Sequence, residues 1–123
     1  MDTTRQDHIV KTLLTAKDKM HFSTEIIIRL LDVFLKSTYE NTQEILLALK
    51  SNDIKALEMK AHAIRGGALA LDLEMIATLC HALEYGNQEK ETDYQALWGE
   101  LDAEVNYLYT NKECIFNALK SAA

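Results

Sequence analysis

One histidine in the sequence stands beside a cation and a pair of adjacent glycines, in the stretch AHAIRGGALALD at residues 61–72. The imidazole of His62 is a candidate nucleophile, because a neutral ring carries one unprotonated nitrogen. Arg65 follows one helical turn later on the same wall and could hold an added anion. Since glycine inside a helix costs about 1 kcal/mol relative to alanine, Gly66 and Gly67 need an explanation. We expect them to clear space for a large partner to approach the ring.

A second pair of polar side chains lies beyond the next turn of the chain. His81 and Glu84 come nineteen and twenty-two residues after His62. If the two helices pair antiparallel across a turn near residues 71–73, His62 and Glu84 lie at similar heights, about ten and twelve positions from that turn. Glu84 could then accept the Nδ1–H of His62 and leave the Nε2 lone pair exposed as a nucleophile. We expect His81, one turn from Glu84, to join the same network.

These residues also have plain structural interpretations. His62 could be an ordinary surface histidine, and Arg65 and Glu84 could be solvated charges on the wall of a helical bundle. Met59 and Leu69 flank His62 and could form either an apolar docking rim or the periphery of the core. The predicted docking surface beside His62 comprises Glu58, Met59, Gly66, Gly67 and Leu69.

Five helical segments must position these side chains. We expect helices at about residues 4–17, 23–49, 54–71, 73–85 and 92–120, on the basis of apolar spacing and capping residues. Asp72 is expected to cap the fourth helix, and Thr92 with Gln95 to cap the fifth. The first half of the second helix is apolar nearly all round, so the first helix is expected to lie across it. Short connections between such helices predict an antiparallel up-and-down four-helix bundle with a short extra N-terminal helix, forming a single domain over residues 1–123.

The composition excludes several classes of function. The chain has 13 Lys and Arg against 19 Asp and Glu, a net charge of −6, so neither nucleic acid nor an anionic membrane is expected as a partner. The most apolar run, EIIIRLLDVFL, is interrupted by Arg29 and Asp32 and is too short to span a bilayer. Cys80 and Cys114 belong to no CxxC pattern and are expected to be reduced core residues of a cytoplasmic protein.

The stretch HAIRGGALALD resembles the signature of histidine phosphotransfer (HPt) domains. That signature has a histidine, two residues, Lys or occasionally Arg, then Gly, with a second Gly ten residues after the histidine. The chain is most similar to the N-terminal phosphotransfer domain of chemotaxis histidine kinases, where HxxKGG is followed by a helix reading like LCHALE, residues 79–84 here. The resemblance covers about residues 22–109. Two positions depart from it: Arg65 replaces the usual Lys, and Asp72 replaces the usual Gly.

The resemblance implies a phosphoryl relay. In that reading His62 is phosphorylated, Glu84 and His81 support it, and Arg65 steadies the phosphate. The partners would be a response-regulator receiver domain, whose aspartate gives or takes the phosphoryl group, and a sensor or hybrid histidine kinase. The chain has no Gly-rich phosphate loop and no compact carboxylate cluster for Mg²⁺. We therefore expect a carrier that is not itself an enzyme and has no cofactor, with Mg²⁺ on the partner receiver.

Two alternatives remain open from the sequence. One is an adaptor that docks on a receiver or kinase without being phosphorylated. The other is a metal site within the bundle, with carboxylate and imidazole ligands from Glu58, His62, His81 and Glu84. Receiver binding that is insensitive to substitution of His62 would favour the adaptor, and elemental analysis would test for the metal.

Overall fold

The computed structural model describes residues 3–88 and 91–122, and in these segments it contains helices and no strand. The helices are α1 (Thr3–Lys19), α2 (Thr24–Lys50), α3 (Ile54–Ala70), α4 (Glu74–Tyr85), the short 3₁₀ helix η1 (Gly86–Gln88), α5 (Tyr94–Thr110) and α6 (Lys112–Ser121). The all-α prediction is confirmed. No helix in the described part of the chain is both long enough and apolar enough to cross a membrane.

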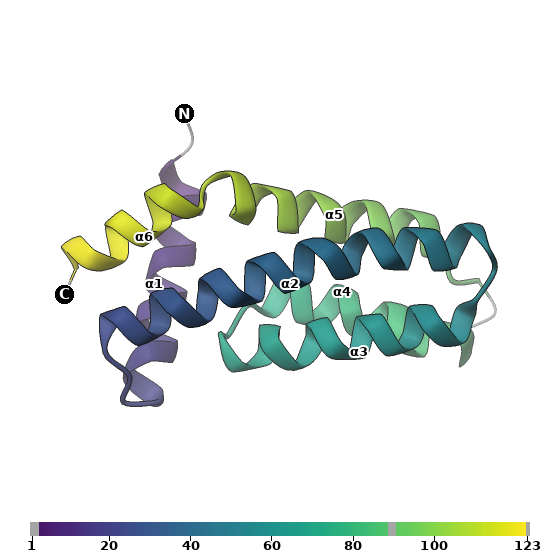
Figure 1. The fold of residues 1–123 in the computed structure, drawn as a ribbon, viewed down its shortest axis with the longest axis horizontal. Helices are drawn as coiled ribbons and strands as arrows, with labels where there is room; N and C mark the ends of the chain where they lie inside the picture. The colour runs from purple at the N-terminus through teal and green to yellow at the C-terminus, as the bar shows by residue number, and fades with distance from the viewer. Residues whose placement is uncertain (1–2, 89–90, 123) are drawn as a thin grey trace.

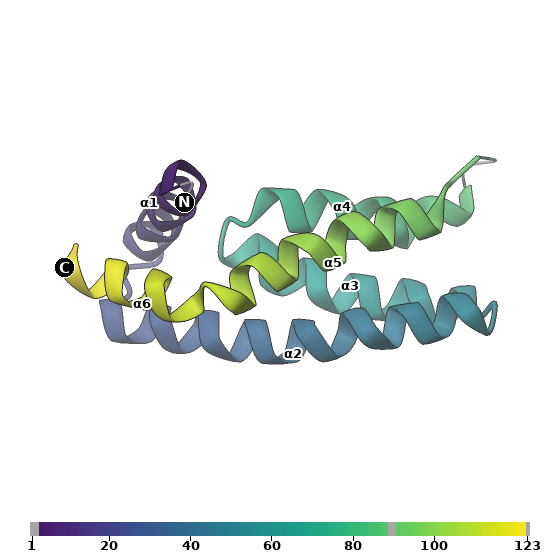
Figure 2. The same ribbon diagram turned by 90° about the horizontal axis from the view of Figure 1, so that it is seen from above.

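Four of the helices form an elongated bundle (Figure 1). α3 packs on α4 and α2, while α5 packs on α2 and α4. α1 crosses one end of this bundle, where α6 continues beyond α5 (Figure 2). The predicted four-helix bundle with an extra N-terminal helix is therefore confirmed. The indole N–H of Trp98 on α5 donates to the backbone oxygen of Thr42 on α2, at 2.7 Å, and fastens these two helices together.

The core determines which side of α3 faces outward. Leu57, Ala61, Ile64 and Ala68 are buried along one side of α3, at the spacing that the sequence predicts for a bundle seam. From α4, the buried set is Ile76, Ala77, Leu79, Cys80 and Leu83. Because a side chain one position from a seam residue is rotated by about 100°, His62 next to Ala61 is directed away from the core.

Three connections use a left-handed residue that is not glycine. His21, Asn52 and Asp72 have φ angles of 56°, 56° and 57°. After α3, the backbone N–H of Asp72 donates to Leu69 at 3.2 Å and that of Leu73 donates to Ala68 at 2.9 Å, which is the hydrogen-bond pattern of a Schellman turn. Aspartate thus fills the position where glycine is usual.

The prediction that Asp72 caps α4 is wrong. The N-cap residue of α4 is Leu73, and no side chain makes the capping hydrogen bond. The carboxylate of Asp72 instead accepts from Nζ of Lys19 on α1, at 3.0 Å. Because the left-handed backbone of Asp72 belongs to the end of α3, its side chain is directed toward α1 and not along α4.

The last predicted helix is also wrong, because the chain bends at Asn111. This residue has φ −100° and ψ 11°, and its Nδ2 donates to the backbone oxygen of Tyr107 at 2.8 Å. The backbone N–H of Asn111 donates to the same oxygen at 3.1 Å, so this carbonyl accepts twice at the end of α5. The start of α5 differs as well, since Asp93 accepts from the backbone N–H of Ala96 in place of the Thr92–Gln95 pair.

The expectation that α1 lies across the apolar half of α2 holds for one side of that half only, where α1 contacts α2 and shares its hydrophobic core. α1 lies across the end of the bundle, where Arg5 pairs with Glu104 and its guanidinium lies 3.8 Å from the ring centre of Tyr107. This position leaves three large apolar side chains of α2 exposed: Ile26, Leu30 and Val33, called the α2 stripe below.

The two cysteines differ in their surroundings. Both are free, Cys80 buried in α4 and Cys114 exposed on α6, so the predicted core position holds for Cys80 alone. Burial raises the pKa of the Cys80 thiol to about 12, which keeps it protonated and unreactive at neutral pH.

Candidate functional site

His62 stands on the solvent-exposed side of α3, called the open flank below. Its side chain is 72% exposed, although the adjacent Ala61 is fully buried. The ring is therefore reachable from solvent without any movement of the bundle.

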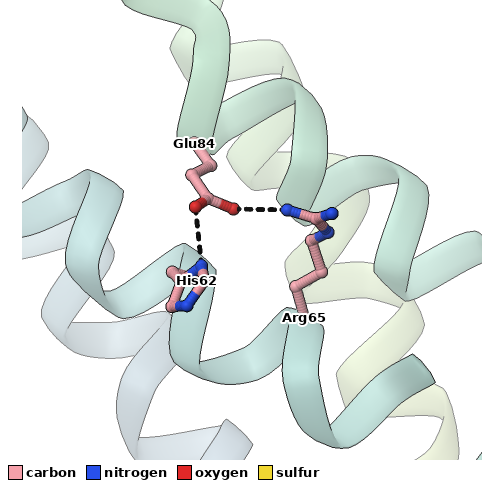
Figure 3. Close-up of polar contacts among 3 residues, drawn as sticks. All are labelled: His62, Arg65 and Glu84. Carbon is pink, nitrogen blue, oxygen red and sulfur yellow. Dashed lines mark hydrogen bonds and ion pairs between the residues drawn. The ribbon is translucent and has the colours of Figure 1, made fainter. Parts of the chain in front are cut away.

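Glu84, in the last turn of α4, lies directly behind this ring (Figure 3). Its side chain is only 12% exposed, and its Oε1 accepts from Nδ1 of His62 at 2.6 Å. Its other oxygen, Oε2, accepts from Arg65 at 3.0 Å. The predicted contact across the α3–α4 hairpin is thus present, and both carboxylate oxygens are occupied.

The charge of Glu84 determines where the proton of His62 sits. Burial by itself would raise the pKa of Glu84, but hydrogen bonds from Arg65 and then His62 outweigh burial and lower that pKa below its ordinary value. Glu84 is therefore ionised at neutral pH and can only accept hydrogen bonds. It follows that a neutral His62 carries its proton on Nδ1 and its lone pair on Nε2, which is directed away from Glu84 (Figure 3).

Arg65 is held between α3 and α4. Besides its bond to Glu84, its guanidinium carbon lies 5.9 Å from the ring centre of Tyr85. Its pKa is raised, first by the hydrogen bond to Glu84 and then by one to Tyr85. The structure thus places Arg65 as a support for the carboxylate. Its role in steadying an anion on His62 stays a prediction.

His81 does not join this network directly. Its ring lies 4.7 Å from that of Tyr85 at an interplanar angle of 46°, and no hydrogen bond joins it to Glu84 in the described part of the chain. On a helix, positions i and i+4 are closer in angle than positions i and i+3. His81 therefore meets Tyr85 more readily than Glu84, which corrects the expected contact.

The two glycines have different surroundings. A Cβ atom added to Gly66 would meet no atom within 4 Å, whereas one added to Gly67 would lie 2.6 Å from Cδ1 of Phe34 on α2. Gly66 lies on the open flank, as expected. The assignment of Gly67 to the docking surface is wrong, because this glycine allows α2 and α3 to approach each other.

The other predicted docking residues lie around His62. Met59 and Leu69 are exposed, and Glu58 helps to line a hollow of about 560 Å³ next to the ring, together with Glu84 and Tyr85. Sequence reasoning missed Tyr85 and the α2 stripe. The signal for Tyr85 was an aromatic residue directly after Glu84.

The metal-site alternative requires Glu58, His62, His81 and Glu84 to converge. They do not, since His81 packs on Tyr85 and both oxygens of Glu84 are engaged by His62 and Arg65. Within residues 3–88 and 91–122, no group of three or more His, Cys, Asp or Glu side chains is arranged to hold a metal ion.

A family model described as the Hpt domain matches residues 29–110, which include His62, Arg65 and Glu84. No curated protein and no solved structure matched the chain. Hpt domains are phosphocarrier modules of phosphorelay signalling, without kinase activity of their own, and they interact with receiver domains and histidine kinases. Since the match covers more than half of the sequence, this chain belongs to the Hpt domain family.

Proposed function

We propose that His62 accepts a phosphoryl group on Nε2 and passes it to or from an aspartate of a receiver domain. The observation that carries this proposal is the 2.6 Å contact between Glu84 and Nδ1 of a ring that is itself 72% exposed. That contact leaves the Nε2 lone pair free and accessible.

In the transfer from a receiver, the Nε2 lone pair forms the new N–P bond. The bond between phosphorus and the aspartyl oxygen breaks, and its electron pair stays on the aspartate as a carboxylate. The imidazole ring, still protonated on Nδ1, gains a positive charge. The anionic Glu84 stabilises this charge because it already holds the Nδ1 proton. The reverse transfer follows the same steps backwards, with a neutral His62 as the leaving group.

The partner supplies the remaining chemistry. Phosphoryl transfer depends on positioning and on cations that neutralise charge on the transferring oxygens. This chain contributes the nucleophile and its support, and we assign the Mg²⁺ to the receiver. A sensor or hybrid histidine kinase is the other partner from which phosphoryl groups enter the relay.

The receiver is proposed to dock on the open flank of α3 and on the α2 stripe. Because Phe34 packs against Gly67, the preceding residue Val33 lies level with the last turn of α3, which carries Leu69. Val33 and Leu69 are both exposed, and we propose that they form one apolar docking patch. A patch of this kind is typical of a site for protein–protein contact.

The test is incubation with a phosphorylated receiver, followed by measurement of acid-labile label on this chain. His62→Gln should abolish the label, and His8→Gln, at another exposed histidine, should leave it unchanged. Undiminished label on the His62→Gln variant would defeat the proposal. Tight receiver binding that His62→Gln leaves unchanged, with no label on this chain, would favour the adaptor.

A further inference from the structure

Tyr85 lies beside Arg65, His81 and Glu84, and none of the roles above includes it. It follows Glu84 in the sequence, its ring lies 5.9 Å from the guanidinium carbon of Arg65, and it contacts the ring of His81. It also lines the hollow beside His62. An exposed tyrosine, 41% accessible, thus contacts both Arg65 and His81.

The ion pair behind His62 needs support that the two charges do not provide. The pair is only partly buried, with side chains 28% and 12% exposed, so water still screens it, and a long arginine side chain loses conformational freedom when it is held. Glu84 also lies in the last turn of α4, where the negative end of the helix dipole opposes an anion. An aromatic ring beside a guanidinium restricts its motion and attracts its charge.

We propose that Tyr85 is a positioning residue for His62. Its ring confines Arg65 against Glu84, and Glu84 in turn keeps the proton of His62 on Nδ1. His81 acts one step further away, because it contacts the ring of Tyr85 and not the carboxylate. The kinetic consequence rests on the proposed function, whereas the effect on the His62 proton does not.

The first experiment measures the ring nitrogens of His62 by NMR in the full chain. Tyr85→Ala should move both ¹⁵N shifts toward the values of a mixture of tautomers. Tyr85→Phe keeps the ring and should retain most of the wild-type pattern, losing only what the hydroxyl contributes. The matched control is Tyr39→Ala, because Tyr39 is equally exposed at 40% and also pairs with a ring, that of Tyr109 at 4.9 Å. It should leave His62 unchanged.

The second experiment measures single-turnover transfer from a phosphorylated receiver over a range of receiver concentrations. We expect Tyr85→Ala to lower the maximal rate about fivefold, the size expected for loss of an exposed cation–π contact, with an unchanged half-saturating concentration. His81→Ala should lower the rate about twofold, since its contact is with the ring alone, and His81→Phe should restore it.

The possible outcomes separate the proposals. Wild-type ¹⁵N shifts in Tyr85→Ala would overturn the positioning role, and so would a loss confined to the half-saturating concentration, which would make Tyr85 a docking residue. Equal losses in His81→Ala and His81→Phe would overturn the place given to His81. If His62 is never labelled, the proposed function fails, while the NMR measurement still decides the role of Tyr85.

Discussion

The two flanks of α3 carry adjacent glycines in opposite environments. On the open flank, Gly66 faces empty space beside the exposed ring of His62, whereas on the packed flank Gly67 lies against the ring of Phe34. Two glycines that are adjacent in the sequence therefore have different structural roles. The close contact between Gly67 and Phe34 fixes the rotation of α3 about its axis. The exposure of His62 therefore depends on how tightly α3 packs on α2.

Gly67→Val should have the largest effect on stability. The added atoms would overlap Cδ1 of Phe34, and overpacking of this kind costs about 1–3 kcal/mol of unfolding free energy. Chemical denaturation followed by circular dichroism measures the loss. Gly66→Ala is the control and should raise stability by up to about 1 kcal/mol, because it adds a better helix former in open space. Similar losses in both variants would erase the distinction between the flanks.

Glu84→Gln should leave the fold intact and slow the chemistry. The amide can still accept from Nδ1, but it has no charge to stabilise the cationic ring, so we expect about a tenfold lower maximal transfer rate, which corresponds to about 1.4 kcal/mol. Single-turnover kinetics at saturating receiver measures this loss. An unchanged rate would show that hydrogen bonding to His62 suffices without charge.

Gly66→Leu should block access to the open flank without destabilising the fold. No atom lies within 4 Å of an added Cβ, so stability should rise as in Gly66→Ala, yet the new side chain would obstruct a partner approaching His62. We expect about a tenfold weaker receiver binding, the size typical of a disturbed contact near the centre of an interface. Titration with a receiver measures this, and unchanged affinity would place the docking surface elsewhere.

Asp72→Ala should have a smaller effect, at the turn that sets the register of α3 against α4. An alanine with φ near 57° costs about 1 kcal/mol, and the exposed pair with Lys19 adds little. Asp72→Asn tolerates the left-handed backbone and is the control. Thermal unfolding of both variants separates the contribution of the left-handed backbone from that of the ion pair with Lys19. Equal losses of stability in the two variants would show that the ion pair is the more important.

The smallest expected effect is the dependence of stability on pH. Because the pKa of Glu84 is lower in the folded chain than its ordinary value of about 4.5, Glu84 contributes stability that is present above that value and is lost as the pH falls through the folded pKa. In Glu84→Gln, the unfolding free energy should fall less between pH 7 and about pH 3 than it does in the wild type. Chemical denaturation at the two pH values measures this difference. If the unfolding free energies of the wild type and Glu84→Gln depend on pH in the same way, the Glu84–Arg65 pair fixes the proton of His62 without stabilising the fold.

The contact between His62 and Glu84 could be predicted from the sequence because both residues belong to one hairpin, at similar distances from its turn. Helical periodicity also predicted that His62 lies beside the buried seam of α3. The packing of Phe34 against Gly67 could not be predicted, since it depends on the rotation of α2 about its axis. Periodicity likewise did not show that His81 would turn toward Tyr85.

Contacts between distant parts of the chain were beyond prediction. Arg5 and Glu104 are 99 residues apart, and only the assembled bundle brings them together. The bend at Asn111 is accompanied by a side-chain hydrogen bond to the carbonyl oxygen of Tyr107, which an apolar spacing pattern does not record. The α2 stripe stays exposed although α1 and α6 both pack on α2 at this end of the bundle.

The bond from Trp98 to Thr42 gives the protein a built-in optical reporter. This is the sole tryptophan of the sequence, and its indole lies where α5 meets α2, two helices that do not carry His62. The fluorescence emission of Trp98 should therefore change as α5 and α2 separate during denaturation. It provides a dye-free readout of folding for every variant, independent of whether the imidazole is phosphorylated.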